Sequence, residues 1–295
     1  MDTSVLTIVF TDLVGSVRML SQFSDAVAVD LVRALDRQVQ DALPAFRGTF
    51  IKSTGDGQLL TFEEPSAAAR CAAEIHRLCE GVARTQRVDL FVRVALHCGE
   101  VFHGDGDIHG NTVNLAARLL AIAGPCETCL SNATWSSLQA PDRAGFVPHG
   151  PEVFKGFSLY TLVHKKTNAN AALEATFRQR TMIDADAPLV AAQHTPRHPA
   201  YVLALDHPEV KKAIVLCDGE THTIGRAPEC STVIPDRTFS GTHAAFAVVD
   251  GVTWAFDLQS ANGLVYKGRR INRRRPLDVG SRVDLPTGTV DVKLP

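Results

Sequence analysis

The first 165 residues combine two hydrophobic periods, a pattern typical of mixed helices and strands. Apolar runs and alternating apolar and polar residues predict strands at 4–10, 48–62 (a hairpin), 88–96, 127–131, 146–154 and 158–163. Apolar residues at helical spacing predict helices at 17–43, 65–78 and 110–123. The order strand, helix, hairpin, helix, strand is that of a ferredoxin-like α+β sheet, and we expect its helices to lie on one face.

The last third of the chain has a different pattern. Short β-prone runs separated by glycine, proline and aspartate predict an all-β sandwich, with strands at 201–205, 212–216, 222–224, 243–249, 253–257 and 283–285. The residues between the two patterns are polar and rich in alanine, which is typical of a linker. We therefore expect an α+β domain at 1–164, a linker at 165–198 and a β-sandwich domain at 199–295.

Composition narrows the class of protein. A chain of 295 residues with 45% hydrophobic residues can bury two cores, and its formal net charge of -2 gives no strong bias toward one kind of partner. No apolar run approaches the roughly 20 residues of a membrane span, so no membrane partner is expected. Because the seven cysteines are odd in number and scattered, a secreted disulfide framework is disfavoured and a cytoplasmic location is expected.

Two acidic residues form a candidate metal site. Asp12 follows the first predicted strand, and Asp56 lies in the Gly-Asp-Gly tip of the hairpin, although Asp-Gly is also a common turn by itself. In the expected topology the return strand of the hairpin runs antiparallel beside the first strand and brings the two carboxylates together. Adjacent carboxylates repel each other, so a divalent cation is their natural partner. The turn at 11–16 offers N–H groups to phosphate oxygens, and the whole pattern suggests two-metal phosphoryl chemistry.

Five sequence blocks resemble the class III nucleotidyl cyclase catalytic domain: FTDLVGS at 10–16, KSTGDG at 52–57, VRVALHCGE at 92–100, DIHGNTVNLAAR at 107–118 and FKG at 154–156. The resemblance covers about 1–164. It implies in-line attack of a ribose 3′-oxygen on the α-phosphorus of a nucleoside triphosphate, with two Mg²⁺ or Mn²⁺ ions per site and pyrophosphate as the leaving group.

The resemblance also implies a role for individual residues. The family's metal ligands correspond to Asp12, Asp56 and the Leu13 carbonyl, and its phosphate contacts correspond to Gly15, Ser16, Arg93 and Lys155. Its purine-reading positions correspond to Lys52 and Asp107. The residues that position the ribose and stabilise the transition state correspond to Asn114 and Arg118. In this family the metal acids of one protomer face the purine residues of the other. A symmetric homodimer is therefore expected, and the short connection at 100–107 resembles the subset of the family with an abbreviated dimerisation arm.

The purine can be predicted from hydrogen bonding. Adenine presents an acceptor at N1 and a donor at its 6-amino group, whereas guanine presents a donor and a carbonyl. Lysine only donates and ionised aspartate only accepts, so Lys52 with Asp107 complements adenine. Guanine leaves like groups facing each other, which is costly in a dry pocket. The sequence therefore favours ATP, with GTP as the alternative.

Three motifs in the last third resemble the forkhead-associated (FHA) domain, which binds phosphothreonine peptides: IGR at 224–226, SGTH at 240–243 and DLQSANG at 257–263. The resemblance covers roughly 199–295. It implies phosphate contacts from Arg226 and Ser240, a peptide contact from Asn262 and a loop-bracing role for His243. Gly241 and Ala261 depart from the usual pattern, and each removes a potential contact to the phosphopeptide.

A basic run, Arg269-Arg270 with 273–275, lies in a predicted loop of this region. It could attract nucleic acid or an acidic partner, but no aromatic residue interleaves it as a stacking platform requires. We therefore interpret it as a solvated loop. The sequence as a whole predicts a homodimeric adenylate cyclase with a phosphothreonine-recognition domain that localises or regulates it. The alternatives are a phosphothreonine adaptor with an inactive cyclase scaffold, and a GTP-using cyclase.

Overall fold

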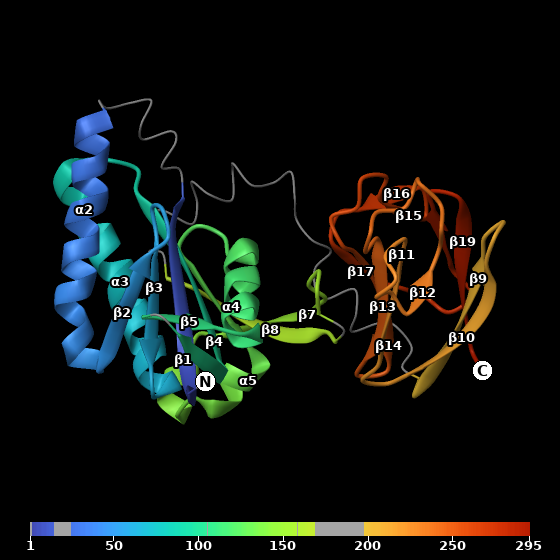
Figure 1. Cartoon of the computed structure of the whole chain (residues 1–295), viewed down its shortest axis with the longest axis horizontal. Helices are drawn as coiled ribbons and strands as arrows, with labels where there is room; N and C mark the ends of the chain where they lie inside the picture. Colours follow the sequence, from blue (N-terminus) through green and yellow to red (C-terminus); the bar gives the residue numbers. More distant parts are fainter. Residues whose placement is uncertain (1, 15–24, 105, 158, 169–197) are drawn as a thin grey trace. The chain divides into compact units, whose positions relative to one another are not determined.

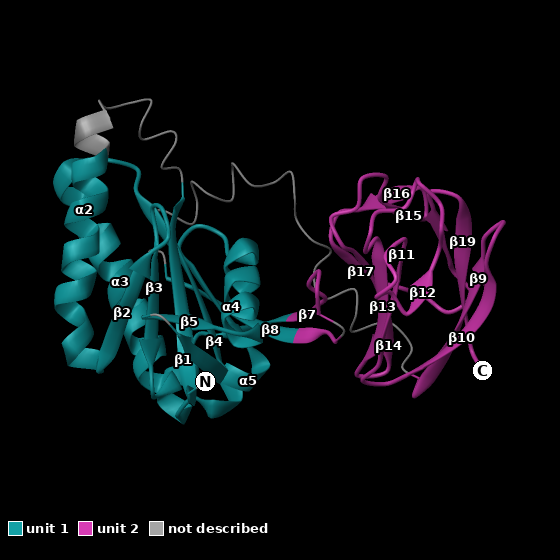
Figure 2. Ribbon diagram, in the orientation of Figure 1, with its two compact units in different colours: residues 1–149, 162–175 teal, residues 150–161, 176–295 magenta. Residues whose placement is uncertain are grey.

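The computed structural model of the chain describes residues 2–14, 25–104, 106–157, 159–168 and 198–295 (Figure 1). They form two compact units, one of residues 1–149 and 162–175 and the other of 150–161 and 176–295 (Figure 2). Most of the expected linker lies outside the described residues. Each unit has its own hydrophobic core.

The first unit is built on a mixed sheet with the order β2-β3-β1-β4-β6-β8-β7, to which β5 adds by pairing with β4. Its strands are β1 (Asp2–Val14), β2 (Gly48–Ser53), β3 (Gln58–Phe62), β4 (Phe91–Gly104), β5 (Asp107–His109), β6 (Glu127–Ser131), β7 (Val147–Glu152) and β8 (Thr161–Thr167). Strand β1 lies antiparallel between β3 and β4, and β6 runs parallel to β4. The first four strands have the predicted ferredoxin-like order.

Helices cover both faces of this sheet, so the prediction of a single helical face is wrong. Helices α2 (Asp25–Ala42) and α3 (Pro65–Gln86) share a core with Val9 and Leu13 of β1. Helix α4 (Asn111–Ile122) lies against β4 and β1 on the opposite face (Figure 1). Ile8 and Phe10 of β1 pack there in a second core cluster with Ala116 of α4. Consecutive apolar residues in β1 bury both of its faces, which is the reason for the second layer.

Several boundaries differ from the predicted ones. Strand β4 begins at Phe91 rather than 88, because α3 continues to Gln86 and ends at Arg87, which has the left-handed conformation typical of a helix C-terminus (φ 55°). The helix predicted at 17–43 is observed as α2 from Asp25, and its start lies outside the described residues. Short helices complete the unit: η1 (Leu43–Phe46), α5 (Asn132–Ser137) and η2 (Ala140–Arg143).

The second unit contains the predicted β-sandwich. One sheet has the order β10-β9-β19-β18-β15-β16 and the other β12-β11-β13-β14-β17. The strands are β9 (Ala200–Asp206), β10 (Lys211–Cys217), β11 (Thr221–Gly225), β12 (Thr232–Val233), β13 (Ala244–Val249), β14 (Val252–Asp257), β15 (Leu264–Tyr266), β16 (Arg269–Ile271), β17 (Arg274–Pro276), β18 (Arg282–Leu285) and β19 (Gly288–Lys293). The core between the sheets includes Tyr201, Phe246 and Val290.

The basic run is not a solvated loop, so that interpretation is wrong. Arg269 and Arg270 lie in β16, Arg274 and Arg275 lie in β17, and Arg274 is buried. The hydrophobic pattern could not reveal these strands because each is three residues long and arginine-rich.

Candidate functional sites

The structure brings the two predicted metal acids together at the end of β1. The β2–β3 hairpin tip contacts β1 so closely that a Cβ on Gly57 would lie 1.9 Å from the Thr11 carbonyl oxygen. The Gln58 backbone N–H also donates to the Thr11 hydroxyl over 2.9 Å. Partial burial raises the pKa of Asp12, and the neighbouring Asp56 carboxyl raises it further.

Arg93 contacts Asp12 directly. The two residues are opposite each other in the β1–β4 ladder, and the Asp12 Oδ2 accepts from Arg93 Nε at 2.7 Å and lies 2.6 Å from Nη2. This ion pair opposes the rise in the pKa of Asp12. Arg93 was expected to contact a triphosphate, and in the structure its guanidinium is bound to the carboxylate next to that expected position.

The donor set at this corner fits a hard divalent cation. Asp12 and Asp56 supply carboxylate oxygens, and the Leu13 side chain is buried in the core, so Leu13 can offer only its backbone carbonyl. Among the residues that the structure describes, no group of three or more His, Cys, Asp or Glu side chains forms a metal cluster. Gly15 and Ser16, the predicted phosphate contacts in the adjoining turn, lie outside the described residues.

The two predicted purine-reading residues form an ion pair. Lys52 Nζ, from β2, donates to Asp107 Oδ2, from β5. The other Asp107 oxygen accepts from the Ile108 backbone N–H over 2.8 Å. The hydrogen bond from Lys52 is the largest of the effects that lower the pKa of Asp107. A donor and an acceptor therefore lie side by side. The assignment of this pair to adenine stays a prediction.

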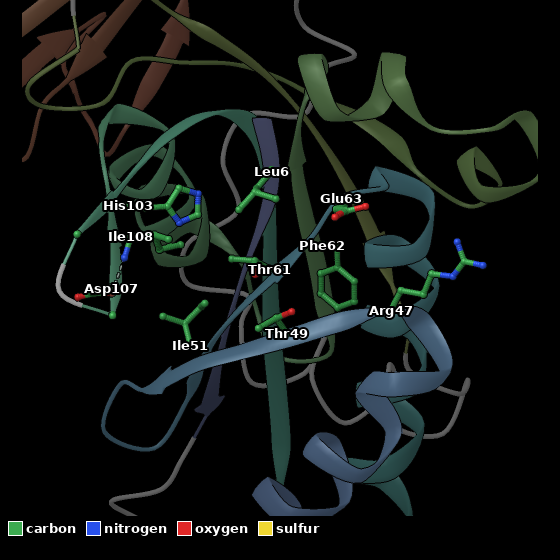
Figure 3. Close-up of a pocket in the computed structure, with 12 residues that line it drawn as sticks. Leu6, Arg47, Thr49, Ile51, Thr61, Phe62, Glu63, His103, Asp107 and Ile108 are labelled. Atoms are coloured by element: carbon green, nitrogen blue, oxygen red, sulfur yellow. Dashed lines mark hydrogen bonds between the residues drawn. The ribbon is translucent and has the colours of Figure 1, made fainter. Parts of the chain in front are cut away.

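A cavity of about 400 Å³ extends from Asp107 across the face of the sheet. Figure 3 shows His103, Ile108 and Asp107 at one end of it and Phe62 at the other. The cavity is within the range of ligand-binding pockets, roughly 300–1,000 Å³. Its lining includes Asp107 and neither metal acid.

The remaining predicted cyclase residues lie on other elements of the chain. Asn114 and Arg118 are exposed and four residues apart on α4, so they share one face of that helix. Lys155 is exposed in a turn of the second unit, closed by a 3.0 Å hydrogen bond from Phe157 N–H to the Phe154 carbonyl. Gly156 in this turn has φ of +90°, which favours glycine.

In the β-sandwich, the three predicted phosphopeptide motifs meet at neighbouring loops. The Arg226 N–H donates to the Ser240 carbonyl over 3.0 Å, and the Ser240 hydroxyl accepts from the Ala261 N–H over 3.1 Å. Asn262 Nδ2 donates to the Thr238 carbonyl over 2.7 Å. The side chains of Arg226 and Asn262 are exposed. These loops therefore bind one another, with the Arg226 side chain exposed and Ser240 half-buried.

His243 lies fully buried beneath these loops. Its Nδ1 accepts from the Ser240 N–H over 3.1 Å, and its Nε2 lies 3.2 Å from the Gly263 carbonyl. The neutral tautomer with the proton on Nε2 satisfies both bonds. Burial lowers the pKa of His243, which keeps this neutral form. The bracing position predicted for His243 is the one it occupies.

Comparison with protein families agrees with this geometry. The family model "Adenylate and Guanylate cyclase catalytic domain" matches residues 2–165, more than half of the chain. The chain belongs to this cyclase family. A second model, "FHA domain", matches 222–286. The protein therefore has an N-terminal class III cyclase domain and a C-terminal FHA domain, as the two resemblances predicted.

Curated relatives match through the cyclase domain. An adenylate cyclase of Streptomyces coelicolor is 33% identical over 118 residues, which are 40% of this chain and 30% of that protein. An adenylate cyclase of Glutamicibacter nicotianae is 30% identical over 150 residues, 50% of this chain and 36% of that protein. An uncharacterized protein of Mycobacterium tuberculosis is 33% identical over 148 residues, so the chain covers 37% of that relative's length.

Solved structures support the same fold. The adenylate/guanylate cyclase/hydrolase of Silicibacter pomeroyi has a TM-score of 0.50 and 26% identity, covering 57% of this chain and 98% of that one. The adenylyl cyclase CyaB of P. aeruginosa has a TM-score of 0.52 at 20% identity, covering 58% of this chain and 98% of that one, which shows the fold. In the part of the chain that the structure describes, no helix is long and apolar enough to cross a membrane.

The structure adds two residues of the cyclase domain that sequence reasoning missed, Gln58 and Asp36. Gln58, which is 1% exposed, donates from Nε2 to Asp36 Oδ1 on α2 over 2.6 Å. Its backbone binds Thr11, so Gln58 ties the hairpin tip to both β1 and α2. The nearby Asp56 contributes to the raised pKa of Asp36, after burial. A glutamine inside an otherwise apolar strand was the available signal.

Proposed function

We propose that this protein is a homodimeric adenylate cyclase that converts ATP into 3′,5′-cyclic AMP and pyrophosphate. The observation that carries the proposal is the apposition of Asp12 and Asp56 in a chain of the cyclase family. A scaffold that only dimerises has no need of two adjacent carboxylates, which repel each other. We assign the catalytic domain to 1–164, the linker to 165–198 and the FHA domain to 199–295.

Asp12, Asp56 and the Leu13 carbonyl are the proposed ligands of two Mg²⁺ or Mn²⁺ ions. When bound, these ions lower the pKa of the ribose 3′-hydroxyl and offset charge in the transition state. Arg93 lies beside Asp12 and can move from that carboxylate to a phosphate oxygen once the carboxylate has another partner. Gly15, Ser16 and Lys155 are the other proposed contacts of the triphosphate.

Lys52 and Asp107 are the proposed readers of adenine. Their ion pair supports this proposal, because it places a donor and an acceptor side by side. Binding of the base exchanges this pair for a Lys52 bond to N1 and an Asp107 bond from the 6-amino group. The cavity beside Asp107 is the proposed purine pocket. Guanine is disfavoured because its donor faces the lysine.

We propose that two copies of the chain complete each active site. The cavity that Asp107 lines does not include Asp12 or Asp56. Asn114 and Arg118 are exposed on α4, where they can orient the ribose and stabilise the α-phosphate of a nucleotide held by the partner's acids. A monomer is then inactive.

For the FHA domain we propose binding of a phosphothreonine-containing protein, which localises or regulates the cyclase. Arg226 and Ser240 provide the guanidinium and hydroxyl donors that a phosphate dianion prefers. Asn262 donates to the Thr238 carbonyl and can exchange this bond for one to the peptide backbone. Gly241 and Ala261 contribute no polar side chain, so the phosphate contacts rest on Arg226 and Ser240.

Product analysis tests the cyclase proposal. Purified protein is incubated with ATP or GTP and Mn²⁺, and the products are identified by mass spectrometry. We expect cyclic AMP from ATP, and a loss of at least about 10³-fold in rate for Asp56→Ala, since electrostatic stabilisation of this kind is worth several kcal/mol. Asp89→Ala, at an exposed aspartate of the same domain, is the matched control and should keep full activity.

Two results would contradict the proposal. Cyclic GMP as the main product would favour the GTP-using alternative. No product from either nucleotide, with a verified dimer, would favour the phosphothreonine adaptor.

A further inference from the structure

Residues 150–161 lie within the range matched by the cyclase family model, yet they belong to the compact unit that contains the FHA sandwich. The segment 150–154 at its start is buried. The next two residues, Lys155 and Gly156, are exposed in the turn that Phe154 and Phe157 close. The segment is therefore a buried strip that ends in an exposed lysine.

One arginine of β17, Arg274, binds the buried segment 150–154. Arg274 Nη1 donates to the Pro151 carbonyl over 2.6 Å and lies 3.0 Å from Glu152 Oε1. The side chains of Arg274 and Glu152 are only 5% and 4% exposed. The guanidinium also lies 5.8 Å from the centre of the Trp254 ring. Loss of one partner of a buried ion pair leaves the other charge uncompensated, so the pair fixes its two strands firmly.

Hydrogen bonds continue from Arg274 to the recognition loops of the sandwich. The neighbouring Arg273 carbonyl accepts from the Asp257 N–H over 2.7 Å. The Asp257 carboxylate accepts from the Ser260 N–H over 2.8 Å, and the Ser260 hydroxyl accepts from the Gly263 N–H over 2.9 Å. The loop that carries Asn262 and the turn that carries Lys155 are thus attached to two adjacent residues, Arg273 and Arg274, at the start of β17.

We propose that Arg274 is a positioning residue for the cyclase reaction, which holds the turn so that Lys155 can contact the triphosphate. The inference rests on the proposed function, in which Lys155 binds phosphate. Arg274 touches no substrate and acts through the Pro151–Glu152 strip. By this arrangement an FHA-domain residue sets the affinity of the cyclase for its nucleotide.

Steady-state kinetics of the full-length protein with ATP and Mn²⁺ test this role. For Arg274→Met we expect KM to rise roughly tenfold with kcat little changed, because a lost charge-assisted contact to phosphate weakens ground state and transition state alike. Arg274→Lys, which keeps the charge, should recover part of the affinity. Arg282→Met is the matched control: it breaks the exposed pair with Asp291 in the same domain and should leave KM unchanged.

A double-variant cycle separates positioning from general damage. In a Lys155→Ala background, Arg274→Met should add no further increase in KM, because the contact it positions is already absent. An equal increase in both backgrounds, or an unchanged KM in the folded single variant, overturns the proposal. If Arg274→Met does not fold, Glu152→Gln replaces it, since it keeps the size of the side chain while removing its charge; its expected increase in KM is smaller, about threefold.

Hydrogen exchange gives a readout that does not depend on activity. Without nucleotide, peptides that cover 150–161 should exchange faster in Arg274→Met than in the wild type or in Arg282→Met. Unchanged exchange overturns the positioning role even if the protein proves to be inactive. Faster exchange in a protein that makes no cyclic nucleotide would support the positioning role of Arg274 and count against the proposed function alone.

Discussion

The cyclase corner and the FHA loops organise their polar groups in opposite ways. In the cyclase domain the charged residues pair with one another, Arg93 with Asp12 and Lys52 with Asp107. In the FHA domain the loops are held by backbone groups and a buried histidine, and the side chain of Arg226 is exposed. Binding in the first region must break ion pairs, whereas binding in the second can use donors already in place.

This difference indicates where each region obtains selectivity. A ligand that opens the Lys52–Asp107 pair must offer an acceptor to the lysine and a donor to the aspartate, so the proposed cyclase site can reject a base with the wrong hydrogen-bonding pattern. Loops that are already fixed lose little conformational entropy on binding, so a small number of phosphate contacts can suffice. The predictions below test this contrast.

The largest effect expected within this contrast concerns the purine pair. Asp107→Asn replaces an acceptor-only group with one that can also donate, so it can face the guanine carbonyl. We expect the preference for ATP over GTP in kcat/KM to fall by roughly 10²-fold, the size of one mismatched buried hydrogen bond to a charged group. The measurement is kcat/KM for both nucleotides under identical metal concentrations.

A control separates specificity from loss of the ion pair. Lys52→Met also breaks the pair with Asp107 but gives the guanine carbonyl no new donor. The two variants are distinguished by kcat/KM for GTP alone, which Asp107→Asn should raise and Lys52→Met should not. If Asp107→Asn leaves the nucleotide preference unchanged, Lys52 and Asp107 do not read the base, and the contrast between the two regions loses its main support.

A smaller effect is expected in the FHA loops. Ser240→Ala removes a phosphate donor and leaves the Ala261 N–H without its acceptor. Affinity for a phosphothreonine peptide should fall about tenfold, equivalent to about 1.4 kcal/mol. Titration calorimetry with a phosphothreonine peptide library and its unphosphorylated counterpart measures this change. Ser281→Ala, which removes one hydrogen bond to Asp278 elsewhere in the domain, should bind normally.

The sequence predicted the parts of the structure that depend on local pattern. The hairpin at 48–62 was readable because β-prone runs flank a Gly-Asp-Gly turn, and β6 has the predicted bounds. The meeting of Asp12 with Asp56 followed from topology, since an antiparallel return strand must bring the hairpin tip to the end of β1. The loop-bracing position of His243 followed from the family resemblance.

Long-range pairing was not readable in the same way. Glu152 and Arg274 lie far apart in sequence, and an arginine in a basic run gives no sign that it will be buried against a carboxylate. The layer of α4 was missed for a related reason. An apolar run such as 8–10 is equally consistent with one or two buried faces, and only the packing of α4 decides between them.

The smallest predicted effect is the pH dependence of the FHA framework. Because burial lowers the pKa of His243, the folded protein keeps it neutral while the unfolded chain, with a pKa near 6.5, takes up a proton. Its contribution to stability is therefore complete above about pH 6.5 and declines below it, by at most about 1.4 kcal/mol per pH unit. The ion pair between Lys52 and Asp107 should persist through this pH range, since the pKa of Asp107 is lowered below 3.8.

Urea unfolding at pH 7.5, 6 and 5 measures this dependence. The chain has two tryptophans, and in a Trp135→Phe background the fluorescence of the buried Trp254 reports on the FHA unit.

His243→Asn retains an acceptor for the Ser240 N–H but cannot titrate, so its stability should fall less steeply with acid than that of the parent. Part of the slope should remain, because burial also lowers the pKa of His222 to about 4. Exposed His109→Asn should leave the slope unchanged, and equal slopes for His243→Asn and the parent would show that the loops do not depend on a neutral His243.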